Sequence, residues 1–144
     1  MAGANTERIP TGIDELDVKL SGGYPKGKAI LVTGEPGSGK TIFGLHFLYK
    51  ACMDGRRCMD IAITLNKKGC TTIFIMDESA YLMTNQVADY SVYGSVRLMV
   101  KENPYTEKME RYLTIPKMRS TDITPDLTVF GITSDGIRLK TKTD

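Results

Sequence analysis

The stretch from Ala29 to Thr41 reads AILVTGEPGSGKT, and it decides the fold. Its first part, Ala29–Thr33, is a short apolar run without alternation, which is typical of a strand covered on both faces of a sheet. The remainder satisfies the phosphate-binding pattern GxxxxGK[ST] completely, and a helical pattern begins at Thr41. A buried strand, a glycine-rich loop and a helix in this order predict a nucleotide-binding α/β fold.

We expect this loop to cradle the phosphates of a nucleoside triphosphate, most simply ATP with Mg²⁺. Its glycines let backbone N–H groups point inward, and the following helix adds its positive N-terminal end. Lys40 should bridge the outer two phosphates, and the Thr41 hydroxyl should ligate Mg²⁺, a hard cation that prefers oxygen. The alternative is a turn that merely joins strand to helix. The candidate nucleotide-binding residues are Gly34, Glu35, Pro36, Gly37, Ser38, Gly39, Lys40, Thr41 and Ile42.

The pattern of elements outside this loop supports an α/β fold. From Thr41 to about Met53 the chain reads as an amphipathic helix, because apolar residues recur at three- and four-residue steps. These apolar residues are Ile42, Leu45, Leu48, Tyr49 and Cys52. A second helix is predicted from Asp60 to Lys68 and a strand from Thr71 to Met76. Antiparallel strands are predicted at 95–101, 108–117 and 127–132, where they extend one edge of the sheet.

The composition narrows the class of protein. The 144 residues, 41% of them hydrophobic and 25% charged, predict one globular domain over residues 1–144. A net charge of +2 is too small to favour a nucleic-acid-coating surface. No apolar run is long enough to span a bilayer and the first residues lack a signal pattern, so a cytoplasmic location is expected. The three cysteines are expected to be reduced, and the lone His46 to be structural.

Beside the loop GEPGSGKT, the chain carries Ile9–Asp17, Gly22–Gly27 and Lys67–Ile75. Together these segments resemble the KaiC-like branch of the RecA superfamily of P-loop ATPases. Lys67–Ile75 is similar to the family's late helix and strand, and the resemblance resumes at Lys117–Thr121 and Phe130–Ile137. The resemblance implies a three-layer fold with a mostly parallel sheet, ATP and Mg²⁺ as ligands, and a regulatory or motor role.

The chain departs from this family between its two matched halves. Only about thirty residues separate Lys40 from Thr71, far fewer than a KaiC-like domain places there. In the family this middle section carries paired catalytic glutamates and the usual magnesium-supporting Asp at a strand end. The chain is therefore expected to be internally shortened, and to bind ATP with weak or absent hydrolysis.

Two residues after the strand at 71–76 could replace part of what is missing. Asp77 and Glu78 follow a run of apolar residues, which is the form of a Walker B strand. Such an Asp can hold Mg²⁺ through water, and the next Glu can orient the attacking water. Thr41 and Asp77 are thus the candidate metal ligands. The resemblance implies the alternative that this strand follows the true Walker B strand and only flanks the site.

Lys117 and Arg119 are the remaining catalytic candidates, and two readings of them stay open. Being two apart, they point to the same face of a strand, where a solvated basic edge is the simplest reading. The resemblance instead implies that both reach the γ-phosphate of a neighbouring subunit in a ring, as arginine fingers do. Two further alternatives remain for the whole chain: a RecA- or RadA-like module that handles DNA, and a decayed copy without activity.

Overall fold

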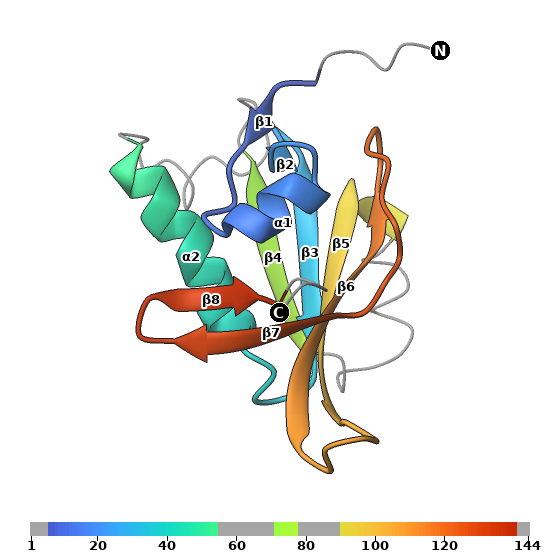
Figure 1. Cartoon of the computed structure of the whole chain (residues 1–144). Helices are drawn as coiled ribbons and strands as arrows, with labels where there is room; N and C mark the ends of the chain where they lie inside the picture. The colour runs from blue at the N-terminus through green and yellow to red at the C-terminus, as the bar shows by residue number, and fades with distance from the viewer. Residues whose placement is uncertain (1–5, 55–70, 78–89, 141–144) are drawn as a thin grey trace.

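The structure, a computed structural model, describes residues 6–54, 71–77 and 90–140, and Figure 1 shows their arrangement. Two helices and eight strands lie in these ranges. In chain order they are β1 (Arg8–Ile9), α1 (Asp14–Lys19), β2 (Tyr24–Pro25), β3 (Ala29–Gly34), α2 (Lys40–Met53), β4 (Thr72–Asp77), β5 (Gly94–Glu102), β6 (Met109–Met118), β7 (Thr128–Thr133) and β8 (Gly136–Leu139). The predicted helix from Asp60 to Lys68 lies outside the described residues.

Six of the strands form one sheet in the order β4-β3-β5-β6-β7-β8. β3 pairs in parallel with β4 and β5, whereas the pairs β5–β6, β6–β7 and β7–β8 are antiparallel. The α/β fold and the antiparallel C-terminal strands are therefore confirmed. The predicted mostly parallel sheet is not seen among the described strands, since only the two pairings of β3 are parallel. The strands β5 to β8 follow one another by short connections, which join antiparallel neighbours.

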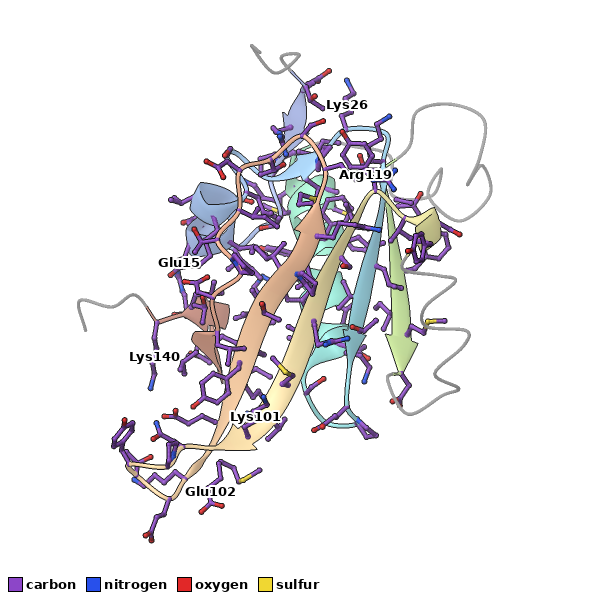
Figure 2. All side chains as sticks on the ribbon, turned by 90° about the vertical axis from the view of Figure 1, so that its right-hand side faces the viewer. Glu15, Lys26, Lys101, Glu102, Arg119 and Lys140 are labelled. Carbon is purple, nitrogen blue, oxygen red and sulfur yellow. The ribbon has the colours of Figure 1, made fainter. Side chains whose placement is uncertain are left out.

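The core of the described residues lies on one face of this sheet. Ile30 and Val32 of β3 are fully buried, and they belong to the same apolar cluster as Phe43 and Phe47 of α2. The sheet curls, so that β8 contacts both α1 and α2 (Figure 1). Figure 2 looks onto the opposite face of the sheet, with α2 behind the strands. A layer on that face is not among the described residues, so the third layer stays a prediction.

The predicted helix at 41–53 is confirmed as α2, but it buries a different face from the one expected. Its buried residues are Phe43, Gly44, Phe47 and Ala51. Leu45 and Tyr49, which belong to the predicted apolar stripe, are 55% and 67% exposed. Both faces of this helix carry apolar side chains, so the spacing alone could not tell which one meets the sheet. An exposed apolar stripe remains on α2.

The same helix carries His46, which is predicted to be structural, and Cys52, which is predicted to be a reduced thiol. The Nε2 atom of His46 accepts a hydrogen bond of 2.8 Å from the backbone N–H of Ile137, so His46 ties β8 to α2 and its structural role is confirmed. Cys52 is disulfide-bonded, and the prediction of a reduced thiol is wrong for it. Cys52 lies exposed at the end of α2 and not in the core, a position that cysteine spacing does not reveal.

The N-terminal segment closes the core from the side of β8. β1 and β2 form a short antiparallel pair, and Leu16 and Leu20 of the α1 region are fully buried. The backbone N–H of Thr11 donates a 2.7 Å hydrogen bond to Asp17. Burial raises the pKa of the Asp17 carboxyl, and the hydrogen bonds from Thr11 oppose that rise. Neither described helix is long and apolar enough to cross a membrane.

Candidate nucleotide-binding site

The loop Gly34–Thr41 connects the carboxyl end of β3 to the start of α2, as the sequence predicts. Gly37 and Gly39 have φ angles of 78° and 97°, in the left-handed region that glycine adopts most readily. Within the loop the N–H of Ser38 donates to the carbonyl oxygen of Glu35 at 3.2 Å. The N–H of Phe43 donates to the carbonyl oxygen of Gly39 at 2.9 Å and closes the first helical turn. The loop is therefore a compact turn directly before a helix N-terminus.

Gly34 sits where no side chain fits. A Cβ atom at this position would lie 2.5 Å from the carbonyl oxygen of Leu98 and 2.6 Å from Ser38 Oγ. Ser38 is itself fully buried, and its hydroxyl has no hydrogen-bond partner among the described residues. A Cβ at Gly37, in contrast, would meet nothing within 4 Å. The loop thus has a tightly packed base, an unsatisfied inward hydroxyl and an open tip, which are features that fit a bound anion.

Lys40 turns back over this loop. Its ammonium donates hydrogen bonds to the carbonyl oxygens of Gly34 at 2.9 Å and Glu35 at 2.8 Å. An ammonium has three donor directions, so the geometry leaves one of them for another acceptor. Thr41 and Ile42, the next residues of α2, are exposed at the start of the helix. The positive charge therefore lies at the loop and beside an accessible hydroxyl.

Two residues of β7 support the loop from the side, and no motif in the sequence marks them as site residues. A Cβ at Gly39 would lie 3.2 Å from Ile132 Cδ1 and 3.8 Å from the ring of Phe130. Phe130 is buried, and Ile132 packs against the same core. The alternation of apolar residues in 128–132 signals a strand with one buried face, but it does not show that this face meets the loop.

Asp77 ends β4 directly beside the loop, since its register partner in β3 is Gly34. Neighbouring strands lie about 4.8 Å apart. Asp77 also lies on the same face of β4 as Ile73 and Ile75, because the three are two residues apart. Ile73 and Ile75 line a groove of about 190 Å³ together with Thr41. The two candidate metal ligands, Thr41 and Asp77, therefore lie at the same end of the sheet and on the same face. Glu78 lies outside the described residues.

Lys117 and Arg119 lie at the opposite end of the sheet. Lys117 is the register partner of Ser95, and the N–H of Arg119 donates to the carbonyl oxygen of Tyr93 at 3.2 Å. Tyr93 in turn donates its N–H to Ala29, the first residue of β3. Ala29 and Gly34 are five steps apart, or about 17 Å along an extended strand. Figure 2 labels Arg119 at one end of the sheet, with Lys101 and Glu102 at the other.

Because of this placement, the structure brings together one set of candidates and separates the other. The loop residues and Asp77 form one cluster at the carboxyl ends of β3 and β4. Lys117 is level with Leu31, about 10 Å along β3 from Gly34, and Arg119 is level with Ala29, about 17 Å away.

Comparison with known proteins agrees with this fold and loop. The family model for the KaiC ATPases matches residues 9–64 and 60–144, in two pieces that overlap at residues 60–64. A solved KaiC-like protein from Pyrococcus horikoshii superposes with a TM-score of 0.77. It is 19% identical, and the match covers 94% of this chain and 100% of that one, which shows a shared fold.

Curated relatives match over shorter stretches. The circadian clock protein KaiC2 of Synechocystis is 47% identical over 57 residues, which are 39% of this chain and 10% of that protein. The DNA repair protein RadA of Mycobacterium tuberculosis is 40% identical over 57 residues, or 40% of this chain and 12% of that protein. These matches span only about a tenth of each relative's length. The family model, by contrast, covers nearly the whole chain, and the chain therefore belongs to the KaiC family of ATPases, within the RecA superfamily.

Proposed function

We propose that this chain binds ATP through Gly34–Thr41, with weak or absent hydrolysis of its own. The observation that carries the proposal is the base of the loop, where Gly34 leaves no room for a Cβ and the buried Ser38 hydroxyl lacks a hydrogen-bond partner in the part of the chain that the structure describes. A turn that merely joined a strand to a helix would require neither feature. The ammonium of Lys40 supplies the charge that a polyphosphate needs.

Magnesium is part of the proposal. Thr41 offers an exposed hydroxyl at the helix start, and Asp77 offers a carboxylate at the adjoining strand end. Both are oxygen donors, which Mg²⁺ prefers, and the ion would retain water and phosphate oxygens as its other ligands. When bound, it would neutralise charge on the outer phosphates. Asp77 acting through water, and Glu78 orienting a water, are the groups proposed to give any residual hydrolysis.

A homo-oligomer, most simply a ring, completes the proposal. Along β3, Arg119 lies about 17 Å and Lys117 about 10 Å from the loop of their own chain, so both are proposed to act on the nucleotide of a neighbouring subunit. The oligomer would then place the amino end of one sheet against the carboxyl end of the next, which is a heterologous contact of the kind that closes into rings. We expect the chain to form a single domain and to act in the cytoplasm.

The first test is calorimetric titration with ATP, with and without Mg²⁺, of the wild type and of Lys40→Ala. Loss of a charge-assisted contact to phosphate should weaken binding about ten- to hundredfold. Lys50→Ala is the matched control, because Lys50 lies on the same helix, far from the loop, and forms a part-exposed ion pair with Asp54. Equal affinities of wild type and Lys40→Ala would remove the loop from the binding site.

A second candidate function is DNA handling, which the RadA match favours. It predicts binding of single-stranded DNA that weakens steeply with salt.

The decayed-copy alternative predicts a broad thermal transition that ATP does not shift, whereas a binding protein is stabilised by its ligand. The buried apolar cluster that joins β1, α1, α2 and β8 supports cooperative folding.

A further inference from the structure

The turn that follows Lys117 is held in place by side chains from distant parts of the chain. It comprises Arg119, Ser120 and Thr121, and Ser120 adopts a left-handed φ of 56°. A non-glycine residue in this region is strained, and surrounding contacts must hold it there. The turn bears Arg119, so whatever fixes the turn also fixes the direction from which Arg119 leaves the sheet.

Arg8 of β1 makes the main contacts to this turn. One arm of its guanidinium donates a hydrogen bond of 2.7 Å to Thr121 Oγ1, and the other donates one of 2.7 Å to the carbonyl oxygen of Ser120. The contact spans more than a hundred residues of sequence, from the N-terminal strand to the segment after β6. A planar guanidinium that donates from two arms restricts both position and orientation, which a single ammonium cannot do.

Tyr93, directly before β5, makes the second set of contacts. Its hydroxyl donates to Ser120 Oγ at 2.8 Å, and its carbonyl oxygen accepts the N–H of Arg119 at 3.2 Å. Lys28 lies over the Tyr93 ring with its ammonium 5.1 Å from the ring centroid. Tyr93 thus links the turn to the amino end of the sheet by both its backbone and its side chain.

We infer that Arg8 and Tyr93 are positioning residues, which hold the 119–121 turn so that Arg119 can reach the nucleotide of a second copy of this chain. The inference rests on the proposed function and adds to it the residues that aim the cation. The guanidinium of Arg8 donates to the turn and, at 3.5 Å, to the carbonyl oxygen of Gly23, so Arg8 is not proposed to touch the nucleotide. The role divides the cations at this end of the sheet: Arg119 acts, and Arg8 orients it.

The experiment measures nucleotide-driven self-association of the full chain by sedimentation, with Mg²⁺ and a non-hydrolysable ATP analogue. The affinity of dilute chain for the same analogue is measured beside it. Arg8→Gln, Arg8→Lys, Tyr93→Phe and Arg119→Gln are compared with Lys26→Gln. Lys26 is the matched control because it is an exposed cation at the same end, and its ammonium is paired with Glu7 and not bonded to the turn.

We expect Arg119→Gln and Arg8→Gln to weaken nucleotide-driven association about tenfold, as loss of one charge-assisted contact would, with binding by dilute chain unchanged. Arg8→Lys should recover part of the loss, and Tyr93→Phe should have a smaller effect. The double variant Arg8→Gln with Arg119→Gln should be no weaker than Arg119→Gln alone, because Arg8 is proposed to work through Arg119. Lys26→Gln should behave as the wild type.

Four results would overturn the inference, and only the last of them would also refute the proposed function. Additive effects in the double variant would show that Arg8 acts independently of Arg119. Equal weakening of association with and without nucleotide would show a general structural role. Analogue binding without nucleotide-driven association would remove the neighbouring-subunit role while leaving the phosphate loop intact. Absence of analogue binding by the wild type would instead refute the proposed function, and the inference with it.

Discussion

The two neighbours of β3 differ sharply in how well they are packed. On one side β5 contributes Val96 and Leu98, both 0% exposed, and beyond it the sheet curls onto α1 and α2. On the other side β4 carries Phe74 and Ile75, which are 47% and 48% exposed. Among the described residues, β4 is the last strand of the sheet on that side. The exposed stripe of α2, with Leu45 and Tyr49, lies on the same side of the molecule, where Leu45 and Ile75 line one groove.

The difference shows where the phosphate loop gets its support. Leu98 of β5 presses its carbonyl against Gly34, and Phe130 and Ile132 of β7 lie against Gly39. These contacts come from the well-packed side. The section that the family resemblance leads us to expect, and that this chain is too short to hold, would supply the catalytic acids and not these contacts. Binding and hydrolysis are thus expected to depend on different sides of β3.

The largest effect expected from this comparison is on stability. Leu98→Ala should lower the free energy of unfolding by about 3 kcal/mol, because it leaves a cavity in a close-packed core. Ile75→Ala on the open side should lower it by about 1 kcal/mol, since half of the side chain is already exposed. Urea denaturation measures both. Equal losses for the two variants would show that the sides do not differ in packing.

The next effect concerns the loop itself. Gly34→Ala should cost about 2 kcal/mol, because the new Cβ meets a backbone carbonyl that cannot move aside, and it should also abolish ATP binding. Gly37→Ala is the matched control. It meets nothing within 4 Å, so only the left-handed φ opposes it, at about 1 kcal/mol. Calorimetric titration and urea denaturation of both variants test this. ATP binding by Gly34→Ala at wild-type affinity would contradict the proposed support from β5.

The smallest effect is expected where β8 is tied to α2. His46→Ala removes the acceptor for the N–H of Ile137, and the loss should be about 1 kcal/mol in the free energy of unfolding. Leu45→Ala, one residue earlier and on the exposed stripe, should cost less. Thermal unfolding of both variants compares the two faces of one helix. A larger loss for Leu45→Ala would mean that the exposed stripe is covered in solution.

Much of this fold could be predicted because its signals are local. The apolar run before the loop, the glycines within it and the periodic helix after it all lie within 25 residues, and β3 and α2 form as expected. The buried face of α2 could not be predicted, because apolar residues occur on both faces and only the curled sheet selects one. The disulfide at Cys52 depends equally on tertiary placement.

The candidate site divides in the same way. The loop could be read from its pattern, whereas its support by Leu98 and Ile132 comes from strands more than fifty residues further along. Sequence spacing correctly suggested that Asp77 ends a strand, but only the β3–β4 register places it beside Gly34. That Lys117 and Arg119 lie at the far end of the sheet follows from the antiparallel direction of β6. Register and direction are long-range properties that no short pattern encodes.

The position of β4 at the edge of the described sheet has an evolutionary consequence. A sheet that loses units from its edge keeps every pairing among the strands that remain, whereas loss of an interior strand would leave its neighbours without hydrogen-bond partners. If the middle section that the resemblance implies was lost from this chain, a loss that ends just before β4 would leave the phosphate loop on its original scaffold. Both the proposed ATP binding and the proposed loss of hydrolysis would then follow from one event in the gene.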